Sequence, residues 1–239
     1  PGLLLGRDFW NRVVDFGALV DEGVIATHDL DIVHWYLGLK GPTKVAAFGG
    51  RLSLPGSSDN GETPDTQDAI FEYPGVQIAY SLREGGAGSR GGAGLEFIGA
   101  KGGMRVSRGG YQVIPDMRVD PNNAIPQFQG HTAGGPPRSE TKPEPWTPAT
   151  EMKGSSPEQF DLHVRNFLDA IKTRQPTVAP AEDGHRVATA CHLANISLRV
   201  GRSLRWDADR EEILGDREAA AMLERPYRKP WDAVLRSLL

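Results

Sequence analysis

The residues best suited to chemistry form one cluster, Thr27-His28-Asp29-Leu30-Asp31. His28 and Asp31 are three positions apart, so a helix places them on one face. Asp31 can then orient the imidazole of His28 and stabilise its protonated form, which suits a proton donor or acceptor near neutral pH. Three interpretations of His28 stay open: a packing or cap-forming residue, a catalytic acid–base group, and a metal ligand completed by Asp31 with Asp21 or Glu22.

The remaining histidines and the single cysteine predict structural roles. His34 falls near the opposite edge of the same helix and is expected to pack. His131 lies in a Pro- and Gly-rich stretch and is expected to be solvated. Three others lie beside apolar helical positions, which favours packing: His163, His185 and His192. The apolar surroundings of Cys191 argue against a reactive thiol. A single cysteine excludes an internal disulfide and a Cys-rich zinc site.

One glycine motif imitates a dinucleotide site. Gly86-Ala-Gly88-Ser-Arg-Gly91 spells G-x-G-x-x-G, but that fingerprint needs a strand before it and a helix after it, so that pyrophosphate meets the helix N-terminus. Residues 93–98 predict another strand instead. We interpret the motif as a hairpin loop, and we expect no cofactor bound tightly to this chain alone.

Composition excludes several classes of partner. The 239 residues carry a net charge of −4, without the basic footprint that nucleic acids select. No apolar run approaches the roughly 18 residues that a membrane span needs. We therefore expect neither nucleic acid nor a membrane as a partner. The chain begins at Pro1 rather than Met, so its localisation stays open between cytoplasm and periplasm.

The elements that must position the cluster are a helix and an antiparallel sheet. Apolar residues at three- and four-residue spacing predict a helix over 21–39. Gly38 and Gly41 with Pro42 are the signals that end it. Short strands separated by Gly or Pro turns follow: 45–54, 68–73, 76–82, 95–98, 104–107 and 111–114. This order indicates an α+β fold, an open and mainly antiparallel sheet with helices packed on one face.

The last half of the chain changes character twice. Residues 115–157 are rich in proline and lack periodicity, and predict a long irregular excursion, either a surface loop or a lid or partner-clasping arm. Residues 158–239 are mainly helical. Ser156 and Pro157 supply a helix start, a second helix is expected over 183–200, a short strand near 204–206, and a last short helix over 216–223.

Several motifs in order resemble the glucose–fructose oxidoreductase / inositol dehydrogenase / MocA (Gfo/Idh/MocA) family. Gly17-Ala-Leu-Val-Asp21 and Ala26-Thr-His-Asp-Leu-Asp-Ile-Val-His-Trp-Tyr-Leu-Gly38 are similar to its signature helix. Residues 63–75 resemble the hairpin of its sheet, and residues 95–106 resemble its G-x-x-G strand turn. The C-terminal segments are similar to its bacterial C-terminal extension: 163–171, 183–201 and 227–231.

The resemblance implies an oxidoreductase of two domains, of which this chain corresponds to the second. Family members hold NAD or NADP in an N-terminal Rossmann domain, which also carries a catalytic lysine. Their α+β domain supplies substrate contacts and oligomer interfaces. We expect residues 1–239 to be this substrate-binding and oligomerisation domain, with the nucleotide-binding domain missing from the chain, which alone would be inactive.

Matched by position, His28 corresponds to the catalytic histidine of the family and Asp31 to its helix partner. The sequence departs from the pattern four residues before the histidine, where Val24 replaces an acidic residue and Asp21 and Glu22 lie further back. The resemblance assigns no role to either of these two carboxylates.

The implied activity is transfer of a hydride between a nicotinamide and a carbohydrate or polyol alcohol, in a homo-oligomer joined through the sheet face. An NAD-dependent glycosidase-type activity stays open, because some relatives cleave glycosidic bonds through transient oxidation. A non-catalytic binding or assembly domain and a metal-dependent enzyme built on His28 and Asp31 are the alternatives from other classes.

Overall fold

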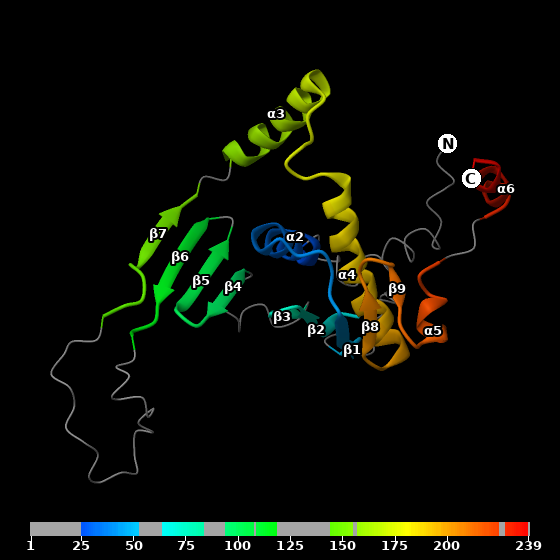
Figure 1. Ribbon diagram of the computed structural model, residues 1–239, viewed down its shortest axis with the longest axis horizontal. Helices are drawn as coiled ribbons and strands as arrows, with labels where there is room; N and C mark the ends of the chain where they lie inside the picture. Colours follow the sequence, from blue (N-terminus) through cyan, green and yellow to red (C-terminus); the bar gives the residue numbers. More distant parts are fainter. Residues whose placement is uncertain are drawn as a thin grey trace, which may run out of the picture. The chain divides into compact units, whose positions relative to one another are not determined.

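The computed structural model describes residues 25–52, 64–83, 94–107, 109–118, 144–154, 157–224 and 228–238 (Figure 1). The chain divides into two compact units, one formed by residues 1–91 and 178–239 and the other by residues 92–177. Antiparallel open sheets and helices make up both, which confirms the predicted α+β class. A single substrate-binding domain over residues 1–239 stays a prediction.

The first unit is built on a five-stranded sheet in the order β3-β2-β1-β8-β9. Its strands are β1 (Lys44–Gly50), β2 (Thr66–Tyr73), β3 (Val76–Arg83), β8 (Leu204–Asp207) and β9 (Glu212–Ile213). The β2–β3 hairpin turns at Gly75, whose φ of 77° lies in the region that glycine tolerates best. Strand β1 pairs on its other side with β8, which lies about 155 residues further along the chain.

One face of this sheet carries the core, because helix α4 (Ala181–Val200) packs there and helix α2 (Ile25–Leu37) packs against α4. Strand residues alternate in burial, so Val45, Ala69 and Phe71 point inward. Phe71 is fully buried, which stabilises the fold by roughly 1.5–3 kcal/mol. Helix α4 ends at Gly201, which adopts the left-handed conformation expected of a glycine cap.

The opposite face of the same sheet is open among the described residues. Phe48 of β1 is 70% exposed and Ile70 of β2 is 40% exposed. The register places them on one side, because Ala46 pairs with Ile70 and Phe48 pairs with Asp68. Helices thus cover one face of this sheet, as predicted.

The second unit holds a four-stranded sheet in the order β4-β5-β6-β7. Its strands are β4 (Leu95–Gly99), β5 (Gly102–Ser107), β6 (Gly110–Pro115) and β7 (Thr150–Lys153). We expect one continuous sheet from the meander, whereas the described strands pair in two. The local turns specify each hairpin. Which strand pairs with the outer edge of a hairpin depends on residues far away in the sequence.

The prediction for the middle of the chain needs correction. The excursion predicted over 115–157 is not irregular throughout, because β7 pairs with β6 and Met117 forms a bridge with Pro145. Helix α3 (Pro157–Thr173) follows, and it carries apolar side chains that are exposed: Phe160, Val164, Phe167, Leu168 and Ile171.

The C-terminal residues form short helices. Helix α5 (Arg217–Ala220) starts at Asp216, whose carboxylate accepts a hydrogen bond from the Ala219 backbone N–H, and α6 (Trp231–Leu238) follows. Across the described part of the chain, none of the helices combines the length and the apolar character that a membrane crossing requires.

Candidate active site on helix α2

Helix α2 displays His28 on the molecular surface because its other face is anchored in the core. Ala26, Leu30 and Val33 recur at three- and four-residue spacing and are buried, and α2 packs against α4. His28 lies between them in sequence and on the exposed side of the helix. Its imidazole is therefore accessible to a ligand from solvent.

Asp31 lies at the edge of the same helix, half-buried toward α4. Burial raises the pKa of its carboxyl group, the neighbouring Asp183 of α4 raises it further, and His28 lowers it. His28 and Asp31 therefore interact through their charges, although no hydrogen bond joins them within the described part of the chain. Their predicted catalytic roles stay a prediction.

A second titratable pair lies beneath the surface. The Nε2 atom of His34 lies 2.6 Å from the hydroxyl oxygen of Tyr73 on β2, with the two rings edge to face. His34 is only 5% exposed, and burial together with the charge of Arg186 lowers its pKa to about 4. His34 is thus a neutral packing residue, in agreement with the expectation from its position.

The sequence analysis missed Tyr73 as the partner of His34. Tyr73 shares the inward parity of Gln67, Ala69 and Phe71 along β2, so alternation alone could have placed it in the core. Burial raises the pKa of its hydroxyl group. The pairing with a helix 39 residues away in the sequence has no local signal.

Cys191 is buried, whereas His163 and His185 are exposed and do not pack as predicted. Burial raises the pKa of the Cys191 thiol to about 12, so it stays protonated. His185 is half-exposed and its Nε2 lies 2.7 Å from Glu211. His163 is exposed on α3 rather than packed. His131 lies outside the described residues.

A metal centre finds no support in the described residues, which hold no group of three His, Cys, Asp or Glu side chains arranged to bind an ion. Asp21 and Glu22, the carboxylates that would complete a set with His28 and Asp31, lie outside the described residues.

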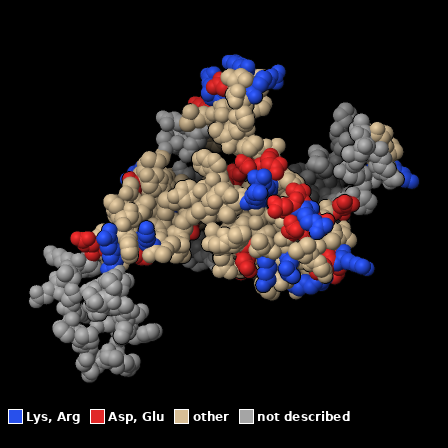
Figure 2. All heavy atoms as spheres, viewed as in Figure 1, with Lys and Arg blue, Asp and Glu red and all other residues tan. Residues whose placement is uncertain are grey.

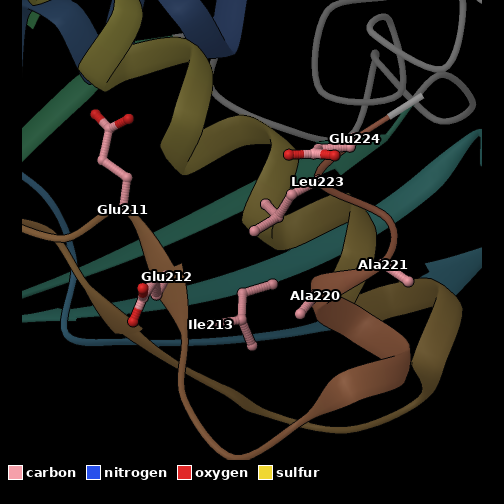
Figure 3. Close-up of a pocket in the computed structure, with 7 residues that line it drawn as sticks. All are labelled: Glu211, Glu212, Ile213, Ala220, Ala221, Leu223 and Glu224. Atoms are coloured by element: carbon pink, nitrogen blue, oxygen red, sulfur yellow. The ribbon is translucent and has the colours of Figure 1, made fainter. Parts of the chain in front are cut away.

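A hollow of about 750 Å³ lies elsewhere, between β9 and α5 (Figure 3). It is lined by Ile213 and Leu223 together with three glutamates, Glu211, Glu212 and Glu224. Positive and negative side chains are interspersed over this end of the first unit (Figure 2), where Arg202 binds Asp216 and Glu218. None of the predicted site residues lines the hollow.

The N-termini of helices α3 and α4 do not fit the pyrophosphate of NAD or NADP. A pyrophosphate binds free backbone N–H groups at a helix N-terminus. The first turn of α4 carries Glu182 and Asp183, and α3 begins at Pro157, which has no N–H. The G-x-G-x-x-G motif at Gly86 lies outside the described residues.

One segment of the chain matches a protein-family model. Residues 148–233 match the model of the oxidoreductase family's C-terminal alpha/beta domain. The resemblance to the Gfo/Idh/MocA family is thereby confirmed. A search of curated proteins found no similar sequence.

The chain is similar to several solved structures, one of which supports the fold with a TM-score of 0.50. A protein from Desulfitobacterium hafniense, named as an NADPH-dependent oxidoreductase, aligns with a TM-score of 0.50 at 14% identity, over 82% of this chain and 49% of that one. An oxidoreductase from Agrobacterium radiobacter, solved with NAD+, L-tartaric acid and magnesium, has a TM-score of 0.47 at 17% identity, over 75% and 47%. Myo-inositol 2-dehydrogenase from Lactobacillus plantarum has a TM-score of 0.41 at 16% identity, over 83% and 53%. The chain spans about half the length of these structures.

Proposed function

We propose that this chain is the substrate domain of an NAD(P)-dependent oxidoreductase acting on the CH–OH group of a sugar or polyol. The observation that carries the proposal is the match of residues 148–233 to the C-terminal alpha/beta domain of an oxidoreductase family. The substrate class rests on the resemblance of the α2 segment to the family's signature helix.

The part of this chain in the reaction is the proton step. Oxidation of an alcohol releases a hydride and a hydroxyl proton, and the nicotinamide takes the hydride when it is bound. His28 takes the proton through its accessible imidazole. Asp31 is half-buried one turn further along α2, and its negative charge favours a positive charge on His28. In the direction of reduction the same imidazolium returns the proton.

The N-termini of α3 and α4 do not suit a pyrophosphate, and the family that the chain resembles holds NAD or NADP in a separate domain. We therefore propose that a nucleotide-binding domain outside the described residues holds the nicotinamide cofactor, and that the chain alone has no oxidoreductase activity. A sugar with a glycosidic bond would contact the same base, His28. The test therefore also measures NAD-dependent cleavage of glycosidic bonds.

The test is a panel of sugars and polyols offered to the full-length protein with NAD+ or NADP+, with reduced nicotinamide and released sugar as readouts. Removal of a positioned acid–base group costs about 10²–10⁴ in rate. We expect His28→Asn to lower the turnover number by that factor, with an unchanged melting temperature because His28 is exposed.

His163→Asn is the matched control, because His163 is also an exposed helical histidine but lies on α3. It should leave turnover unchanged. Wild-type turnover in His28→Asn would remove His28 from the mechanism, and no reduction of either nicotinamide by any alcohol would contradict the proposed activity.

A further inference from the structure

We propose that Lys101, Arg118 and Trp146 form an oxyanion-binding site on the second unit, for the carboxylate or phosphate group of a small ligand. The site goes beyond the proposed function, because it uses none of the residues of α2.

The three side chains meet at the end of the four-stranded sheet. The Lys101 ammonium nitrogen lies 5.8 Å from the centroid of the Trp146 ring, and the Arg118 guanidinium carbon lies 5.3 Å from the same centroid. The indole of Trp146 is 42% exposed, and Lys101 and Arg118 are also exposed. Two cations thus share one ring that solvent can reach.

Backbone hydrogen bonds fix this arrangement. Arg118 N–H donates to the Glu144 carbonyl at 2.7 Å, and Trp146 N–H donates to the Asp116 carbonyl at 2.9 Å. Met117 forms a bridge with Pro145 between them, so residues 116–118 and 144–146 make a short antiparallel ribbon. The Arg118 and Trp146 side chains therefore start from a defined backbone.

Lys101 is tied to the same ribbon through the β4–β5 turn. The Asp116 N–H donates to the Lys101 carbonyl at 3.0 Å. Gly102, at a φ of 137°, makes this approach possible, because a Cβ there would lie 2.4 Å from the Ile114 carbonyl oxygen. The sequence Lys-Gly-Gly at 101–103 thus brings a cation to the ribbon.

Neither cation is paired with a carboxylate in the described structure. Arg105 pairs with Glu96 in the same sheet, whereas no ion pair is formed by Lys101 or Arg118. The ribbon also contains Asp116 and Glu144, which are exposed and make no ion pair there either. The planar guanidinium of Arg118 therefore keeps its paired N–H donors free for two oxygens of one ligand group.

The size and charge of the cluster indicate the ligand. Attraction to the indole ring holds each cation beside Trp146, and an oxyanion that reaches both is stabilised by two positive charges. The flexible stem of Lys101 lets its ammonium reach the oxyanion that Arg118 holds. Two cations at one ring suit a single oxyanion rather than a polyanion such as nucleic acid, which selects an extended basic surface. A ring beside that oxyanion would meet the exposed indole, so sugar acids and sugar phosphates are the probes of choice.

The experiment follows the indole N–H signals of the 239-residue chain by ¹H–¹⁵N NMR, with the Trp146 signal assigned from Trp146→Phe. Sodium glucuronate, glucose 6-phosphate, inorganic phosphate and neutral glucose are titrated separately at constant ionic strength. We expect a saturable shift of the Trp146 signal with glucuronate, with the phosphates, or with both, and none with glucose. Which anion binds more tightly identifies the carboxylate or the phosphate as the preferred source.

The variants are Lys101→Gln and Arg118→Gln, with Lys153→Gln as the matched control because Lys153 is an exposed lysine of β7 in the same sheet. We expect each site variant to weaken binding at least tenfold and the control to leave it unchanged. Should Arg118→Gln lose the dispersed spectrum of a folded unit, Arg118→Lys and Lys101→Gln provide the same comparison. No shift with either class of anion, an equal shift with glucose, or equal binding by the site variants would overturn the proposal.

Discussion

At the scale of single residues, the two histidines of α2 differ through burial rather than through sequence context. His28 is exposed, whereas His34 is buried beside Tyr73 and its Nδ1 atom has no hydrogen-bond partner in the described structure. Helical spacing from His28 to Asp31 predicted that these two would share a face, and their charges do interact. The contact of Asp31 with Asp183 required α4 to pack there, which no local pattern specifies.

The buried imidazole of His34 predicts how stability depends on pH. Its pKa falls from 6.5 in the unfolded chain to about 4 in the folded one, so the unfolded state binds the proton more readily. Stability is complete above pH 6.5 and is lost as the pH falls toward 4, by up to about 3 kcal/mol. Urea unfolding at pH 7 and pH 5 measures this loss.

The His34→Gln variant is the comparison for that measurement, because glutamine keeps a polar group near Tyr73 but does not titrate. Asp31 has a raised pKa and contributes with the opposite sign, and this contribution is common to both proteins. We expect the variant to be less stable at pH 7 and to lose less stability than the wild type between pH 7 and pH 5. Equal losses would remove His34 as the cause.

At the scale of elements, turns and periodicity predicted most of the local structure. The strands 68–73 and 76–82 are observed as β2 and β3, and the helix over 183–200 is observed as α4 with its glycine cap. The sequence did not predict β7, because Thr150–Lys153 is short, exposed and follows several prolines. Its pairing with β6 depends instead on a backbone approach that one glycine allows.

Gly110 is the glycine that lets β7 pair with β6. Its φ is 132°, and a Cβ at this position would lie 1.9 Å from the Met152 carbonyl oxygen. Gly110→Ala should therefore separate the strands, at a cost of at least about 1–3 kcal/mol. We expect the amides of Thr150–Lys153 to lose protection in hydrogen exchange.

Gly109→Ala serves as the adjacent control, because a Cβ there would meet only the Ser107 hydroxyl at an ordinary 3.6 Å. Protection of β7 should survive in that variant. Retained protection in Gly110→Ala would show that the pairing does not need the glycine.

At the scale of the whole molecule, the open face of the first sheet exposes apolar side chains that suit binding to a partner. From the composition we expect no nucleic acid as a partner. The exposed apolar residues on the face opposite α4 favour association with a protein instead. Phe48 and Ile70 lie on that face together with the charged residues Lys44, Asp68 and Glu72, and Asp68 pairs directly with Phe48. Exposed apolar side chains set among charged ones are typical of an interface between protein subunits.

We expect this face to join two copies of the chain in a two-fold homo-oligomer, in which the same patch faces itself. Phe48→Glu and Ile70→Glu should each convert the oligomer to a monomer, because each replaces an exposed apolar side chain of this face with a charge. Both residues are exposed in the unit, so the melting temperature of the monomer should change little. Light scattering at tens of micromolar measures the mass.

Gln77→Glu is the control, because Gln77 is an exposed and already polar residue of β3 that pairs with Glu72. A wild-type chain that stays monomeric, or variants that keep the wild-type mass, would contradict the interface.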